Sequence, residues 1–333
     1  MYRLNEELLP VNTYRQRLRG ADNPADIVAF DLFADTVLML AGSNNYLIAT
    51  SDDVPRSQSM RLALISDPVR DIEVVDRTIY VATESEGGIR YATLGKLVEE
   101  YQLLPESEGH SVYCLDYSPD HDLLAAGFRD NRIVLYRHTT SDGIPHIDTV
   151  LEDHNDKVLA VAFSASGKYL ASGGADNKLY IWRREGGRWQ PGAGFDTHDN
   201  DIVDLAFSGD SLLLTASTDR TVRLYRDSLD KFWRIPSMIS HNTPVTAVTF
   251  MPTAAGLQAI SGDRNGVIRK WDIASFDSLM RARTFDGLVR EQAAFDAMKD
   301  LKGTSWRLVS RVSGVPEKLV FGQYVFESDC SWT

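Results

Sequence analysis

The sequence has few cysteines, no long apolar run and fewer basic than acidic residues. Its two cysteines, Cys114 and Cys330, form no Cys-x-x-Cys motif and are too few for a disulfide framework. No apolar stretch approaches the roughly 18 residues of a membrane span. No apolar signal segment follows Met1, and no Asn-x-Ser/Thr acceptor occurs. We expect a soluble intracellular protein, cytoplasmic or nuclear, without membrane insertion.

The charge balance argues against general binding of nucleic acids. The chain carries 35 Lys and Arg against 47 Asp and Glu, a net charge of −12. A field of this sign repels the phosphate backbone, and no basic run is present to overcome it. With 43% hydrophobic residues over 333 positions, the chain can bury a full core.

What the sequence does contain is an internal repeat. His110, His154, His198 and His241 follow one another at steps of 44, 44 and 43 residues. After each histidine the text is similar; from His154 it reads HNDKVLAVAFSASGKYLASGGADNKLYIW. Each unit alternates apolar and polar residues between Gly, Asp and Asn turns, which is typical of short antiparallel strands.

The repeat resembles that of the WD40 family. His154, Ser172-Gly173, Asp176 and Ile181-Trp182 match the family's repeat, which is about 40–45 residues long. The resemblance covers residues 110–272 and implies an all-β fold, a WD40 β-propeller of seven blades.

Extending the same step in both directions gives seven units in one domain, residues 1–333. Blades are predicted to start near residues 22, 66, 110, 154, 198, 241 and 285. Because open sheet edges template aggregation, we expect residues 1–20 to contribute a strand that closes the ring. Alternatively, the stretch from Val289 to Leu301 has loosely helical spacing, which would leave six blades and a C-terminal appendage.

The His, Ser, Asp and Trp of one unit have the composition of a catalytic constellation. A reactive Ser–His–Asp set occurs once in a protein, whereas this set recurs with drift. The resemblance implies instead a structural hydrogen-bond chain within each blade, here called the tetrad. Its predicted members are His154, Ser172, Asp176 and Trp182; His198, Thr215, Asp219 and Tyr225; His241, Ser261, Asn265 and Trp271; and His110, Asp130 and Tyr136, with Ala126 in place of the hydroxyl.

No other pattern indicates a cofactor, metal or catalytic site. The stretches Ser172-Gly173-Gly174 and Glu86-Gly87-Gly88 lack the Gly-Lys-Ser/Thr of a phosphate-binding loop. Equal spacing places one histidine on each blade, so they are not expected to converge on a metal.

In WD40 proteins partners commonly bind the rim where the first strand of each blade begins and where the second turns into the third. Arginine and tyrosine are also enriched in interface hot spots. The alternative is that surface charges scatter by chance. The positions that map to this rim are Arg70, Tyr113, Arg129, Lys157, Leu159, Asp201, Arg264 and Arg290.

The sequence therefore predicts a non-catalytic scaffold that binds other proteins, as peptide segments or subunits of a complex. The alternatives are a propeller enzyme that uses the central channel and a reader of a phosphorylated or acidic ligand. A Trp-Asp-x-Arg signature of ubiquitin-ligase adaptors is absent, since the Trp271-Asp272 pair is followed by Ile273 and Ala274.

Overall fold

The computed structural model of the chain shows an all-β protein, in which every regular element that it describes is a β-strand. The residues that it describes are 2–4, 10–13, 27–33, 37–42, 46–51, 60–64, 67–85, 87–93, 101–138, 144–191, 194–196, 198–228, 231–253, 256–273, 306–310, 319–321 and 324–328.

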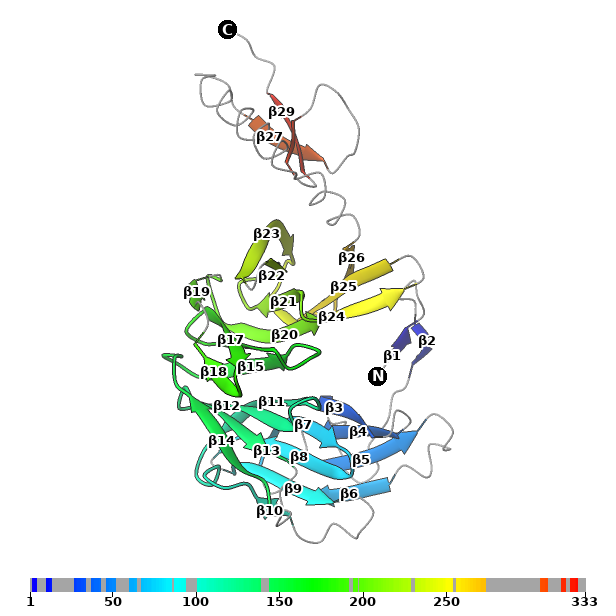
Figure 1. The fold of residues 1–333 in the computed structure, drawn as a ribbon. Helices are drawn as coiled ribbons and strands as arrows, with labels where there is room; N and C mark the ends of the chain where they lie inside the picture. Colours follow the sequence, from blue (N-terminus) through cyan, green and yellow to red (C-terminus); the bar gives the residue numbers. More distant parts are fainter. Residues whose placement is uncertain are drawn as a thin grey trace.

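Six antiparallel sheets, here called blades 1 to 6, follow one another along the chain (Figure 1). Blade 1 consists of β3 (Ile27–Phe33), β4 (Val37–Gly42), β5 (Tyr46–Ser51) and β6 (Met60–Leu64). Blade 2 consists of β7 (Val69–Val75), β8 (Thr78–Thr83), β9 (Ile89–Thr93) and β10 (Gln102–Leu103). Blade 3 consists of β11 (Val112–Ser118), β12 (Leu123–Phe128), β13 (Ile133–Arg137) and β14 (His146–Leu151).

The next three blades repeat this order. Blade 4 consists of β15 (Val158–Phe163), β16 (Tyr169–Gly174), β17 (Lys178–Glu185) and β18 (Arg188–Gln190), with β19 (Gly194–Asp196) also paired to β17. Blade 5 consists of β20 (Ile202–Ser208), β21 (Leu212–Ser217), β22 (Thr221–Ser228) and β23 (Lys231–Ser240). Blade 6 has three described strands, which are β24 (Val245–Thr253), β25 (Gly256–Asp263) and β26 (Ile268–Asp272).

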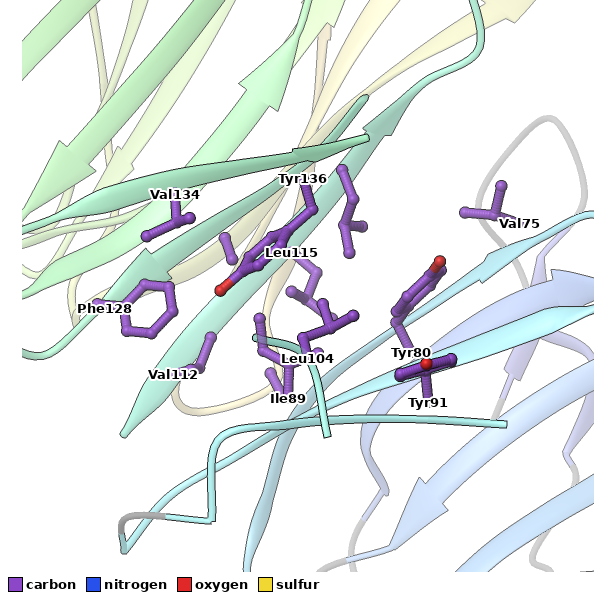
Figure 2. Packing of buried hydrophobic residues seen from close by; sticks show 13 residues of the cluster. Val75, Tyr80, Ile89, Tyr91, Leu104, Val112, Leu115, Phe128, Val134 and Tyr136 are labelled. Atoms are coloured by element: carbon purple, nitrogen blue, oxygen red, sulfur yellow. The ribbon is translucent and has the colours of Figure 1, made fainter. Parts of the chain in front are cut away.

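Apolar clusters lie between neighbouring blades and form the core. The first strands of successive blades lie next to each other, and Figure 1 shows the blades arranged around a common centre. Figure 2 shows the cluster between blades 2 and 3, where Tyr80 and Tyr91 from one blade pack towards Leu115 and Tyr136 from the other. Further clusters lie between blades 3 and 4, blades 4 and 5, and blades 5 and 6. Each blade between two such clusters thus buries both of its faces against neighbours.

Close packing between blades requires glycine at two equivalent positions. A Cβ atom on Gly127 would lie 2.8 Å from Val158 Cγ1, and one on Gly173 would lie 2.4 Å from Ile202 Cγ2. Val158 and Ile202 begin the first strands of the following blades. The missing side chain therefore sets the distance between blades.

Buried carboxylates also join the blades, a feature that the sequence pattern did not reveal. On the first strands, Asp71 accepts a hydrogen bond from the backbone N–H of Leu115 at 2.8 Å, and Asp204 accepts one from Val248 at 2.7 Å. Two further carboxylates reach the next blade in the same way: Asp31 accepts from Val74 N at 2.6 Å, and Asp116 accepts from Phe163 N at 2.5 Å. Burial raises the pKa of Asp71, Asp116 and Asp204 to about 7, against the opposing effect of these hydrogen bonds.

The strands at the two ends of the chain do not decide the number of blades. β1 (Tyr2–Leu4) and β2 (Pro10–Thr13) pair with each other, and β27 (Trp306–Ser310), β29 (Tyr324–Ser328) and β28 (Leu319–Phe321) form a sheet in that order. The predicted blade start near residue 285 and the alternative helix from Val289 to Leu301 lie outside the described residues. Seven blades, the boundaries given above and ring closure by residues 1–20 therefore remain predictions.

Candidate functional site

The tetrad of blade 4 is a continuous hydrogen-bond chain. His154 Nδ1 lies 3.0 Å from Asp176 Oδ2, and His154 Nε2 lies 2.9 Å from Ser172 Oγ. Trp182 Nε1 donates to Ser172 Oγ at 3.1 Å. Because an ionised carboxylate only accepts, Nδ1 carries the imidazole proton and the serine hydroxyl donates to Nε2. The donors therefore run from Trp182 through Ser172 and His154 to Asp176.

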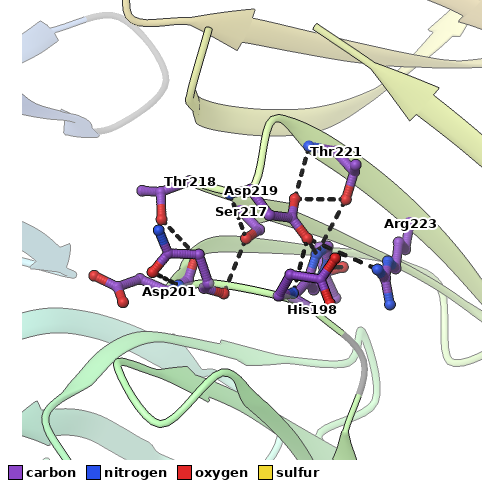
Figure 3. Close-up of polar contacts among 10 residues, drawn as sticks. His198, Asp201, Ser217, Thr218, Asp219, Thr221 and Arg223 are labelled. Atoms are coloured by element: carbon purple, nitrogen blue, oxygen red, sulfur yellow. Dashed lines mark hydrogen bonds and ion pairs between the residues drawn. The ribbon is translucent and has the colours of Figure 1, made fainter.

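Blade 5 repeats the arrangement with different residue types (Figure 3). His198 bonds Asp219 Oδ2 at 2.8 Å through Nδ1 and Thr215 Oγ1 at 2.7 Å through Nε2. The Thr221 hydroxyl and backbone N–H both donate to Asp219 Oδ1, at 2.6 and 2.8 Å. Burial alone would raise the pKa of Asp219, but the hydrogen bonds from His198 and Thr221 outweigh it and lower that pKa well below its usual range. Tyr225, at the position of Trp182, is fully buried.

Blade 6 corrects one predicted member of the tetrad. His241 bonds Ser261 Oγ at 2.7 Å and Asp263 Oδ2 at 3.0 Å, and Trp271 Nε1 donates to Ser261 at 3.3 Å. The carboxylate is Asp263, whereas the sequence pattern had pointed to Asn265, which is exposed. Asp263 follows the histidine by 22 residues, the same step that separates His154 from Asp176. Applying that step to the sequence would have found it.

Blade 3 departs from this pattern. Ala126 offers no hydroxyl, and the Tyr136 hydroxyl donates instead to the carbonyl of Pro105 at 3.1 Å. The His110 side chain is 40% exposed, whereas the other three tetrad histidines are 0% exposed. His110 Nδ1 still lies 3.1 Å from Asp130, which also accepts hydrogen bonds from Arg132 at 2.7 and 3.0 Å.

The buried tetrads are suited to holding a blade together. The Ser172 hydroxyl belongs to a fully buried residue, and Ser261 is 1% exposed, so neither reaches a substrate. Satisfied buried polar networks of this kind stabilise one arrangement of the strands. The same geometry at three successive blades makes the tetrad a structural element of the repeat.

Backbone hydrogen bonds place the predicted rim residues at one end of the blades. In each blade from 2 to 6 the first residue after the second strand donates to a residue at the start of the first strand. These bonds run from Glu84 to Pro68, Arg129 to Ser111, Ala175 to Lys157, Thr218 to Asp201 and Arg264 to Pro244, at 2.8 to 3.0 Å. The turns and strand starts that carry the candidates therefore share one edge, here called the rim.

A β-bulge recurs at the second residue of the first strand in the same five blades. The register shifts at Arg70, Tyr113 and Leu159, three of the predicted partner-binding residues, and at Val203 and Thr246. Bulges redirect side chains out of the regular ladder. The sequence repeat thus positions one redirected side chain per blade at the rim.

The structure brings some candidates together and leaves others apart. Arg70 pairs with Glu84 at 2.6 Å, and its guanidinium lies 5.4 Å from the centre of the Tyr113 ring. Arg129 and Arg264 are exposed; Tyr113, Lys157, Leu159 and Asp201 are half-buried. Arg290 lies outside the described residues.

The described residues contain neither a candidate metal site nor a candidate membrane helix. Within those ranges, no group of three or more His, Cys, Asp or Glu side chains could hold a metal ion. In the same part of the chain, no helix is long and apolar enough to cross a membrane.

Successive antiparallel blades with apolar clusters between them define a β-propeller. A chain of the solved structure described as "Crystal Structure of Mitotic Checkpoint Complex" has a similar fold, with a TM-score of 0.61 at 18% sequence identity. The likeness covers 74% of this chain and 75% of that one.

The family model "WD domain, G-beta repeat" matches residues 101–137, 146–183 and 189–226. Each match begins at or next to the outer strand of one blade and ends in the third strand of the next, so the sequence repeat links neighbouring blades. The chain therefore contains three WD40 repeats, as its sequence predicts.

Curated relatives share part of the chain. Protein HIR1 of Kluyveromyces lactis is 30% identical over 187 residues, which are 48% of this chain and 22% of the relative. Transcriptional corepressor LEUNIG_HOMOLOG of Arabidopsis thaliana is 36% identical over 118 residues, covering 35% of this chain and 14% of the relative. The chain thus spans less than a quarter of the length of these relatives.

Proposed function

We propose that this protein is a non-catalytic scaffold that binds other proteins through the rim, as a subunit of a multiprotein complex. The observation that carries the proposal is the shared placement of Arg70, Tyr113, Arg129, Lys157 and Arg264 on one edge of blades 2, 3, 4 and 6. Propeller blades are rigid, so binding a partner costs little conformational entropy on the scaffold side.

The composition of the rim is suited to an interface. Arginine and tyrosine combine apolar surface with hydrogen-bond donors, and they dominate interface hot spots. Arg70 and Tyr113 already contact each other, which preorganises a cation–aromatic pair for contact with a partner. The chain as a whole has a net charge of −12, so the exposed Arg129 and Arg264 stand out from its predominantly acidic composition.

The rival function, catalysis in the central channel, lacks support of the same kind. The Ser, His and Asp sets of the described blades are repeated and buried, whereas a catalytic set is unique and open to substrate. The relatives' names support a regulatory role, since one of them is called a transcriptional corepressor. An intracellular location, cytoplasmic or nuclear, belongs to the same proposal.

Charge reversal at the rim tests the proposal. The full chain carrying Arg70→Glu and Arg264→Glu is used as bait in its native host beside the wild type. We expect the main partner to be lost, because a hot-spot arginine contributes about 2 kcal/mol or more. Arg188→Glu is the matched control, since Arg188 is exposed and lies near the far end of β17 from the rim.

Full retention of the partner by the double variant would refute the rim as the binding surface. If the partner is acidic, binding also weakens with added salt, because exposed charges are screened over about 10 Å at 0.1 M ionic strength.

A further inference from the structure

An open hollow of about 640 Å³ lies at the rim between blades 2 and 3. Ser85 lines it from the β8–β9 turn, Gly109, His110 and Ser111 from the approach to β11, and Arg129 and Asp130 from the β12–β13 turn. The lining combines one arginine, one histidine, two hydroxyls and one carboxylate. Such a set of convergent polar groups suits a small charged group better than an apolar one.

The hollow lies at the tetrad of blade 3, the one described tetrad that lacks a hydroxyl. Without a hydroxyl at Ala126, His110 stays 40% exposed and Asp130 36% exposed, whereas the carboxylates of the other three tetrads are 3–6% exposed. In the other three blades the same histidine and carboxylate are sealed inside the blade. The sequence change in blade 3 therefore opens polar groups that the fold elsewhere uses internally.

Two residues that line the hollow have left-handed backbone conformations. Gly109 has φ +79°, and a Cβ atom there would meet nothing within 4 Å among the described residues. Ser85 has φ +63°, a left-handed conformation that is uncommon for residues other than glycine.

Among the described charged side chains at the hollow, Arg129 has no carboxylate partner, whereas Asp130 is paired with Arg132. Asp130 accepts hydrogen bonds from Arg132 at 2.7 and 3.0 Å, and these bonds and the Arg132 charge outweigh burial and lower its pKa. Glu84, next to Ser85, pairs with Arg70 at 2.6 Å. No carboxylate within the described ranges forms an ion pair with Arg129, which is exposed.

We infer that this hollow binds the carboxylate of an Asp or Glu side chain, presented by an acidic segment of a partner protein. The inference rests on the proposed function and specifies the chemistry of one part of the rim. The Arg129 guanidinium offers a planar fork of donors that fits a carboxylate bidentately. The Ser85 and Ser111 hydroxyls lie in the same lining and can complete its hydrogen bonds, whereas the His110 ring nitrogens face Asp130 and Arg132.

Charge matching selects a carboxylate over a phosphate monoester. The excess of one positive charge balances a monoanion, whereas a phosphate monoester carries about −1.5 to −2 at pH 7. The additional negative charge would lie beside Asp130 on a chain whose net charge is already −12. A monoanionic side chain avoids that repulsion.

The test uses the folded full chain and arrays of nine-residue peptides with randomised flanks and amidated C-termini. The central residue is Glu, Gln or phosphoserine. We expect binding to the Glu series about tenfold or more above the Gln series, since a charge-assisted bidentate pair is lost in the latter. Arg129→Gln removes this preference, and Arg129→Lys weakens it because the ammonium lacks the fork. Arg220→Gln, an exposed arginine in the β21–β22 turn that does not line the hollow, retains it.

Equal binding of the Glu and Gln series, or a preference that survives Arg129→Gln, would overturn the inference. Tighter binding of the phosphoserine series than of the Glu series would overturn the choice of ligand. If the arrays fail in this way while the Arg70→Glu, Arg264→Glu variant still loses its partner, the scaffold proposal stands and only the hollow is misassigned. Thermal melts of the Arg129 variants check that folding is unchanged.

Discussion

Replacing Trp182 with alanine tests whether the tetrad stabilises the blade. Trp182 is 2% exposed, packs in the cluster between blades 3 and 4, and donates its indole N–H to Ser172. Truncation of a buried tryptophan to alanine costs about 3–5 kcal/mol, mostly from lost burial and the remaining cavity. The lost hydrogen bond adds little, because Ser172 keeps its bond to His154.

The assay is thermal unfolding followed by circular dichroism, with urea denaturation as a second measurement. For a chain of 333 residues the unfolding entropy near the midpoint is about 0.7 kcal/mol/K. A loss of about 3–5 kcal/mol then lowers the melting temperature by about 4–7 °C. Trp182→Tyr is the matched variant, since Tyr225 occupies this position in blade 5; it should cost under about 1.5 kcal/mol.

A fall of less than about 1 °C for Trp182→Ala would refute this reasoning. So would a loss no larger than that of Arg188→Ala, a substitution at an exposed position in the same blade. Ser172→Ala gives an independent check, because it leaves the indole N–H and His154 Nε2 without their partner and should cost about 2–4 kcal/mol.

Four further predictions concern the contacts between blades. The pKa of Asp71, Asp116 and Asp204 is raised to about 7, so the folded chain binds more protons than the unfolded one between about pH 4 and pH 7. These three groups should therefore lower the free energy of unfolding as pH rises through that window. Urea midpoints at pH 5, 6, 7 and 8 measure how steeply stability falls with pH. If Asp116→Asn leaves this pH dependence unchanged, the assignment is contradicted. Gly173→Ala should cost about 1–3 kcal/mol, because its Cβ would lie 2.4 Å from Ile202 Cγ2; unchanged urea unfolding would show that the blades yield at this point. Gly262 has the same register position in blade 6, and a Cβ atom there would have no described atom within 4 Å. If another blade packs there and closes the ring, Gly262→Ala should cost as much as Gly173→Ala. If no blade packs there, Gly262→Ala should cost less. Deletion of residues 1–20 complements that test: we expect aggregation by light scattering, and a soluble product with the wild-type melting temperature would count against closure by these residues.

The acid limit of stability has a different origin from the slope at neutral pH. Hydrogen bonds from His154 and His198 outweigh burial and lower the pKa of Asp176 and Asp219. A depressed carboxyl pKa contributes stability above the unfolded value, near 4, that is lost as pH falls through the folded one. The tetrads and the inter-blade carboxylates therefore act on opposite sides of about pH 4.

The sequence by itself determined the repeat, its strands and most members of the tetrads. These features are encoded locally, because alternation of apolar residues and the step from histidine to aspartate both fall within one unit of about 44 residues. Asn265 was wrong because it came from matching the residue type after the turn, whereas the 22-residue step from His241 leads to Asp263. Tyr136 bonds the Pro105 carbonyl because Ala126 offers no hydroxyl in its blade.

The tertiary structure alone decided how one unit meets the next. Asp71 bonds Leu115 across 44 residues of sequence and Asp116 bonds Phe163 across 47, so no pattern within a unit reports either contact. The Arg70 pair with Glu84 beside Tyr113 and the open hollow at His110 depend in the same way on which turns of neighbouring blades lie together. A repeat specifies the blade because its own strands pair locally, whereas the surface used for binding arises only where side chains from successive blades converge in space.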